Sequence, residues 1–87
     1  MPIIRIVMLE RTAGTSKGYY ELAAIYDVAP CKDLSKEALK VANRKVKYGE
    51  VLKVIPQTET FVTVVVAAFA EEAPELMNLW NAAHPSI

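Results

Sequence analysis

Two segments near the start of the chain have the hydrophobic pattern of β-strands. Residues 3–9 are apolar apart from Arg5 and rich in β-branched side chains, which predicts a strand buried on most of both faces. In residues 19–28 every even position is apolar, whereas the odd positions include Glu21 and Asp27. This alternation predicts a strand with one buried face. A helix over the same residues is the alternative, because Glu21 and the two alanines tolerate helix, but the alternation favours the strand.

The middle of the chain has a helical pattern. Pro30 ends the second strand segment, and Asp33 is a candidate N-cap because its carboxylate can accept hydrogen bonds from the first amides of a helix. Over residues 34–47 the apolar side chains share one side of a helical wheel: Leu34, Ala38, Leu39, Val41, Ala42 and Val46. The opposite side is polar and mostly basic: Lys36, Lys40, Asn43, Arg44 and Lys47. We predict an amphipathic helix over residues 34–47, ended by Gly49 in a left-handed conformation.

The second half of the chain repeats this order. Residues 50–55 predict a third strand and residues 56–59 a turn. Residues 60–69 contain four Val and two Thr and are apolar on both faces, which predicts a central strand covered on both sides or a strand at a subunit interface. Pro74 suits the first turn of a closing helix over residues 74–83. One side of that helix is expected in the core: Leu76, Leu79, Trp80 and Ala83.

The elements therefore follow in the order strand, strand, helix, strand, strand, helix. Short connections within each strand pair favour antiparallel hairpins. We predict a single α+β domain over residues 1–87, with a mostly antiparallel sheet packed against two helices. Hydrophobic residues make up 53% of the 87 residues, which provides a core and excludes a disordered chain.

The composition limits the cellular compartment and the kinds of metal or catalytic site that we expect. The single cysteine, Cys31, cannot form an internal disulfide, and nothing else indicates an oxidising compartment. The pattern contains no secretory signal and no apolar segment long enough to span a membrane, so we expect a cytoplasmic protein without membrane contact. His84 and Cys31 offer two metal ligands at most, and Cys31 has no base beside it in the sequence. We expect no cofactor, no metal site and no catalytic residue.

Charge is distributed unevenly, although the formal net charge is zero. Residues 32–53 contain seven basic and three acidic side chains, whereas residues 54–87 contain four acidic and no basic ones. A basic ridge of this kind can contact a phosphate backbone or an acidic partner. Three further interpretations stay open: an ordinary solvated helix face, pairing between the two halves of the chain, and pairing between neighbouring copies through complementary charge.

The segment between the first two strands combines cations, hydroxyls and rings. Arg11 and Lys17 supply charge, Ser16 can donate to phosphate, and Tyr19 or Tyr20 offers a stacking surface. The run Gly-Thr-Ser-Lys-Gly at residues 14–18, followed by Tyr20, resembles the hairpin of small phage-type single-stranded-DNA-binding proteins with an OB fold. In that family a Gly-x-Ser motif precedes a Lys or Arg, a Gly and a Tyr. The resemblance implies an OB-like sheet and single-strand binding through this loop.

The N-terminus carries a second, shorter resemblance. Pro2-Ile3-Ile4 followed by Leu-Glu-Arg-Thr at residues 9–12 resembles the opening of the small tautomerase family. In that family, removal of Met exposes a proline whose secondary amine acts as a general base, which implies an enzyme dependent on Pro2. The family has a helix directly after its first strand, where this sequence predicts a strand.

Three functions follow from these features. The first is a small protein that binds nucleic acid, single-stranded DNA or RNA, through the hairpin loop and the basic helix face. Its candidate binding residues are Arg11, Ser16, Lys17, Tyr19, Tyr20, Lys36, Lys40, Arg44, Lys47 and Tyr48. The first alternative is a homo-oligomeric interaction or assembly module, expected as a homodimer because a short chain carries excess apolar surface. The second alternative is a tautomerase-like enzyme that uses Pro2.

Overall fold

A computed structural model of the protein describes residues 1–12 and 18–85. The elements are β1 (Ile3–Arg11), β2 (Tyr19–Asp27), α1 (Leu34–Lys45), β3 (Glu50–Thr58), β4 (Phe61–Ala67), a short 3₁₀ helix η1 (Ala70–Glu72) and α2 (Ala73–Ala83). The predicted α+β class and the predicted order of strands and helices are confirmed. The alternative of a helix over residues 19–28 is excluded, because these residues form β2.

The four strands form one open sheet in the order β2-β1-β4-β3. β2 pairs antiparallel with β1, and β3 pairs antiparallel with β4, as the short connections predict. The two hairpins meet where β1 and β4 run parallel. Among the described strands β2 and β3 are edges, so they do not close into the barrel that the OB resemblance implied.

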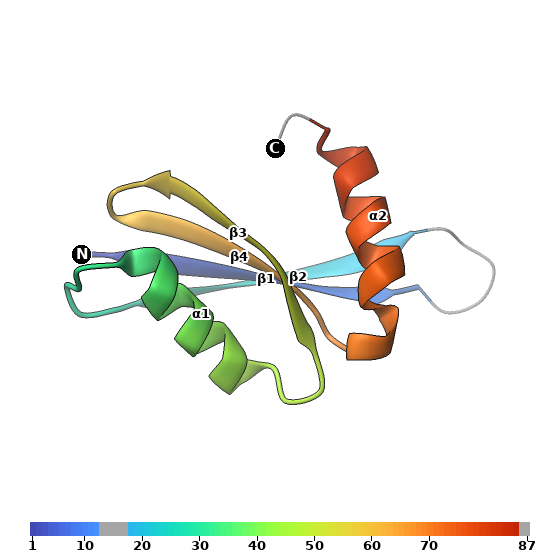
Figure 1. Ribbon diagram of the computed structural model, residues 1–87, viewed down its shortest axis with the longest axis horizontal. Coiled ribbons are helices and arrows are strands. Elements are labelled where there is room, and N and C mark those ends of the chain that lie inside the picture. Colours follow the sequence, from blue (N-terminus) through green and yellow to red (C-terminus); the bar gives the residue numbers. More distant parts are fainter. Residues whose placement is uncertain (13–17, 86–87) are drawn as a thin grey trace.

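Each helix covers a different face and a different half of the sheet. Figure 1 shows α1 beside the half in which β1 begins and α2 beside the half in which β1 ends. Even-numbered strand residues pack against α1: Ile4, Ile6, Val62, Val64 and Val66. Odd-numbered strand residues pack against α2: Val7, Leu9, Val65 and Ala67. We call these surfaces the α1 face and the α2 face. β4 is thus central and buried on both faces, as its sequence predicts.

The α1 helix begins where predicted and ends earlier. Asp33 accepts a hydrogen bond from the Lys36 amide at 3.2 Å, so the predicted N-cap is confirmed. The last helical residue is Lys45, and Val46 is already extended. The prediction that Gly49 ends the helix in a left-handed conformation is wrong. Gly49 is needed for another reason, because a Cβ there would collide with the Ala67 carbonyl oxygen and with the Val46 side chain.

The third strand is longer than predicted. The turn predicted over residues 56–59 is wrong, because β3 continues through Pro56 to Thr58 and only residues 59 and 60 form the turn. An edge strand tolerates proline, since its outer amides need no partner in the sheet. The pairing with β4 also shifts register between Pro56 and Thr58.

The second strand is far less buried than its alternating pattern predicts. Tyr20 and Leu22 lie on the face that was expected to be buried, yet they are 63% and 70% exposed. Ala24 and Tyr26, farther along the same face, are half-buried. The difference arises because α1 covers only the half of its face that contains Tyr26, which packs against the α1 side of the core.

Candidate nucleic-acid interface

The α1 helix presents its basic residues to solvent. Ala38, Val41 and Ala42 are its buried residues and face the sheet. The basic side chains lie on the other side of the helix and are exposed: Lys36, Lys40 and Arg44, followed by Lys47 in the connection to β3. Side chains four residues apart are neighbours on a helix, so the first three form a line. We call these four residues the cation row. The structure therefore brings together four of the predicted binding residues.

Two of the predicted tyrosines are exposed on or beside the α1 face. Tyr20 pairs with Glu10, and the even-numbered residues of β1 face α1, so Tyr20 stands on the α1 face. Tyr48 directly follows the cation row and is 76% exposed. Its backbone is fixed, because its carbonyl accepts a hydrogen bond of 2.8 Å from the Ala70 amide. Exposed rings of this kind offer surfaces on which bases can stack.

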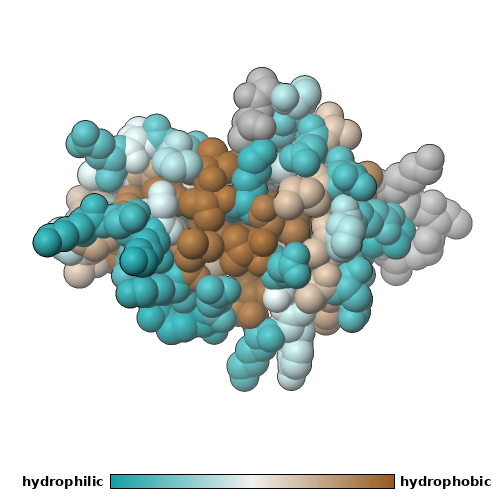
Figure 2. All heavy atoms as spheres, viewed as in Figure 1, coloured by the Kyte–Doolittle hydropathy of each residue, from teal (hydrophilic) through white to brown (hydrophobic). Residues whose placement is uncertain are grey.

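The uncovered half of the α1 face adds apolar surface to this region. Leu22 is 70% exposed beside Tyr20, and its partner Met8 on β1 is half-buried. In Figure 2, hydrophilic atoms cover the outside of α1, and a separate group of hydrophobic atoms lies between the two helices, where β3, the edge strand opposite β2, passes in Figure 1. The α1 face thus consists of a basic helix beside a strip of sheet with exposed aromatic and aliphatic side chains.

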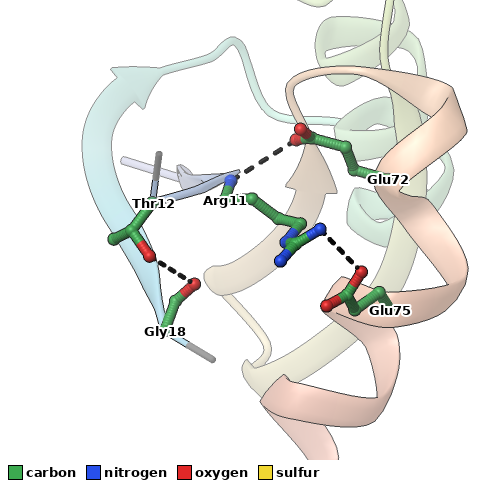
Figure 3. A network of polar contacts seen from close by, with 5 residues as sticks. All are labelled: Arg11, Thr12, Gly18, Glu72 and Glu75. Carbon is green, nitrogen blue, oxygen red and sulfur yellow. Dashed lines mark hydrogen bonds and ion pairs between the residues drawn. The ribbon is translucent and has the colours of Figure 1, made fainter. Parts of the chain in front are cut away.

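Arg11 and Tyr19 lie on the α2 face, away from the cation row. Arg11 Nη1 is 3.0 Å from Glu75 Oε2, and the Arg11 amide donates to Glu72 Oε1 at 3.4 Å, as Figure 3 shows. Tyr19 pairs with Arg11 across the hairpin and packs against the core beneath α2. Burial, and to a smaller extent the negative charge of Glu21, raises the pKa of Tyr19 above 10.0. Arg11 thus ties the end of β1 to the start of α2.

Two other predicted binding residues, Ser16 and Lys17, lie outside the described residues. The described ends of the same connection are joined to each other. The Thr12 amide donates to the Gly18 carbonyl at 3.3 Å. The Thr12 hydroxyl donates to the same oxygen at 3.2 Å, as Figure 3 shows. These bonds continue the hairpin beyond the last paired residues, so β1 and β2 are held together up to Gly18.

The cation row and a group of three glutamates lie on opposite sides of the sheet. The cation row lies on the outer side of α1, whereas Glu71, Glu72 and Glu75 lie at η1 and in the first turn of α2, on the other face. The ion pair between Arg11 and Glu75 is on the α2 side. The cation row and these three carboxylates therefore lie on opposite sides of the sheet, with Arg5 and Arg11 on the α2 face and Glu10 on the α1 face.

The structure also reveals a polar cluster that the sequence analysis did not single out. Arg5 lies on the α2 face in the half that α2 leaves uncovered. Its Nε donates to the Thr63 hydroxyl at 3.2 Å, and its guanidinium carbon is 5.5 Å from the centre of the Phe61 ring. The Thr63 hydroxyl in turn donates to Gln57 Oε1. These contacts stabilise one charged side chain within an apolar strand. In the sequence, this cluster is indicated by the charge of Arg5, which interrupts the apolar residues 3–9.

His84, Cys31 and Pro2 are the residues that the sequence offered for metal binding or catalysis. His84 follows α2, where its Nδ1 is 3.0 Å from the Trp80 carbonyl oxygen and its ring stacks on Trp80 with centroids 3.7 Å apart. Cys31 is exposed. The Pro2 carbonyl accepts from the Val28 amide at 3.1 Å. Within residues 1–12 and 18–85 we find no pocket, no group of three or more metal-ligating side chains, and no helix long and apolar enough to cross a membrane.

No protein-family model, curated protein or solved structure matches this chain. The two family resemblances in the sequence therefore stay predictions. The function has to be inferred from the placement of the residues described above.

Proposed function

We propose that the protein binds single-stranded DNA or RNA through its α1 face. The observation that carries this proposal is the placement of the cation row with exposed Tyr20 and Tyr48, while the carboxylates of η1 and α2 lie on the opposite face. A flexible single strand is bound by cations that contact its phosphates and by rings that stack on its bases. The cation row and Tyr20 are accessible on the α1 side of the sheet, and Tyr48 is exposed directly after the cation row.

Salt dependence is the first test of this proposal. Each phosphate neutralised on a single strand contributes about −0.7 to the slope of log K against log salt concentration. The four members of the cation row therefore predict a slope of about −3. The measurement is fluorescence anisotropy of a labelled oligothymidylate of about 15 nucleotides, a length near the upper site size of small single-strand binders. Absence of binding at about 20 mM salt would contradict the proposal.

A matched pair of charge variants tests where the strand lies. Lys40→Gln removes one member of the cation row and should reduce the magnitude of the salt slope by about 0.7. Lys53→Gln removes the same charge from β3, at a position paired with Val65 of the α2 face, and should leave the slope unchanged. Equal effects of the two variants would show that binding follows net charge rather than the α1 face.

A ring variant tests the second half of the proposal. Tyr20→Leu keeps an apolar side chain on the strand and removes the stacking surface. Stacking of a base on an aromatic ring contributes about 1–3 kcal/mol, so affinity should fall at least about fivefold with no change in the salt slope. An unchanged affinity would exclude Tyr20 from the interface.

A further inference from the structure

The two edge strands of the sheet differ in how well they are protected from pairing with another chain. β3 contains Pro56, and its pairing with β4 shifts register at two places. Prolines and irregular pairing are common devices that prevent an edge strand from pairing with another chain. β2 has neither device, because it pairs with β1 over all 9 residues without a shift and contains no proline and no lysine. Its outer edge is therefore a regular row of backbone groups.

The hairpin bonds identify which backbone groups point outward. At its two ends the Thr12 amide donates to the Gly18 carbonyl, and the Val28 amide donates to the Pro2 carbonyl. Bonded and non-bonded pairs alternate in an antiparallel ladder, so the even-numbered residues of β2 bond to β1. The odd-numbered residues direct their N–H and C=O groups away from the sheet: Tyr19, Glu21, Ala23, Ile25 and Asp27. No strand among the described residues pairs with this side.

Large apolar side chains are exposed on both faces of the same strand. Leu22 on the α1 face is 70% exposed, and Ile25 on the α2 face is 58% exposed. Neither helix reaches them, since each helix covers the other half of its face. An edge without proline, lysine or a register shift, and with exposed apolar side chains on both sides, is typical of a strand that pairs with another strand.

We propose that β2 pairs antiparallel with β2 of a second copy of this chain, which joins the two sheets into one of eight strands. The register with the largest overlap sets Ala23 opposite Ala23 at the two-fold axis. Tyr19 then faces Asp27 of the second copy, and Glu21 faces Ile25 of the second copy. Every outward residue meets an outward residue, and the smallest side chain lies at the axis.

Charge selects this register over its neighbour. Sliding one strand by two residues in one direction sets Glu21 opposite Asp27 of the second copy, and like charges that face each other in a sheet are destabilising. A slide in either direction also shortens the overlap by two residues, and the slide in the other direction leaves Asp27 without a facing residue. The arrangement centred on Ala23 avoids both costs.

The symmetry of this dimer deepens the function proposed above. A two-fold axis perpendicular to the sheet leaves the α1 faces of both copies on the same side, so both cation rows share one surface. On that side each Tyr20 faces Tyr26 of the second copy. The dimer itself does not depend on nucleic-acid binding. Only the conclusion that the surface has two binding regions rests on the proposed function.

Opposite charges at one position test the register. Ile25→Glu sets a carboxylate opposite Glu21 of the second copy, and the dissociation constant of the dimer should rise at least tenfold. Ile25→Lys sets an ammonium group opposite the same carboxylate, and the dimer should stay as tight as wild type or become tighter. Sedimentation equilibrium of the full chain measures both. Circular dichroism shows whether both variants keep the fold, which is expected because Ile25 is 58% exposed.

Cross-linking tests the axis directly. In the proposed register the two Cα atoms at position 23 form a hydrogen-bonded pair about 5.5 Å apart, a separation that a disulfide can span. In a Cys31→Ser background, Ala23→Cys should cross-link rapidly under mild oxidation, whereas Glu21→Cys should not. A monomeric wild type at high micromolar concentration, equal dimerisation of the two Ile25 variants, or equal cross-linking at both positions would overturn the inference. Oligonucleotide binding is measured separately, so failure of the dimer and failure of the nucleic-acid proposal give different results.

Discussion

Burial of β4 on both faces can be tested with two neighbouring residues. Val64 faces α1 and Val65 faces α2, and both side chains are 0% exposed. Val64→Ala and Val65→Ala each delete the same two methyl groups from the same strand. The two variants differ only in which helix packs against the deleted groups. If both helices dock as described, the two variants should cost similar free energies of unfolding.

The expected magnitude follows from the atoms removed. Each buried methyl group contributes about 0.8 kcal/mol through its transfer from water, so the two contribute about 1.6 kcal/mol. Incomplete collapse of the resulting cavity raises the cost to about 2–3 kcal/mol for each variant. Small domains are stable by about 5–15 kcal/mol, so both variants should fold and unfold at clearly lower urea concentration.

The assay is urea unfolding at one fixed protein concentration. The only tryptophan, Trp80 of α2, is 6% exposed and packs against the sheet, so its fluorescence reports on that side of the molecule. Circular dichroism reports on both helices, and coincident transitions would show two-state unfolding. Leu39→Ala, at a position on α1 that is 37% exposed, is the control and should cost less than about 1 kcal/mol. A cost for Val65→Ala below about half that for Val64→Ala would refute the packing of α2 on the sheet.

Two further predictions test single residues. Gly49→Ala should destabilise the fold by about 1–3 kcal/mol in the same urea assay, because the new Cβ meets the Ala67 carbonyl of the central strand, and wild-type stability would contradict this close approach. The pKa of Tyr19 is raised above 10.0 in the folded state, so the unfolded chain loses this proton first, and stability should fall as the pH rises through about 10. Tyr19→Phe should lose less stability between about pH 8 and pH 10.5, whereas an equal loss would refute the assignment.

The strand β4 and the helix α1 could be predicted because their sequences are compatible with only one structure. Residues 61–67 are apolar on both faces, and only a strand covered on both sides buries all of them. Asp33 and the wheel of α1 are equally local signals, because a cap and an amphipathic face depend on residues a few positions apart. These parts of the fold follow from short-range chemistry.

The predictions failed where a contact between residues far apart in the sequence determines the structure. A glycine is required at position 49 because it lies against Ala67 of β4, eighteen positions later in the chain. That Arg11 binds phosphate stays a prediction, but its ion pair with Glu75, far along the sequence, could not be seen from the composition of the loop. The alternation in β2 correctly predicts which side chains share a face. It carries no information about how far a helix extends over that face, so the exposure of Leu22 became visible only in the structure.

The offset placement of the helices connects the two proposals. Because α1 covers one half of its face, it leaves Tyr20 and Leu22 beside an open strand edge. Edge pairing would use the backbone groups in the plane of the sheet, whereas side chains stand roughly perpendicular to that plane. A second copy joined at β2 would therefore cover the flank of Leu22 and leave the outer surface of the α1 face, with its cations and rings, open to a ligand. Dimerisation and strand binding use different atoms of the same strand, and for this reason a variant such as Ile25→Glu, on the opposite face, is expected to separate them.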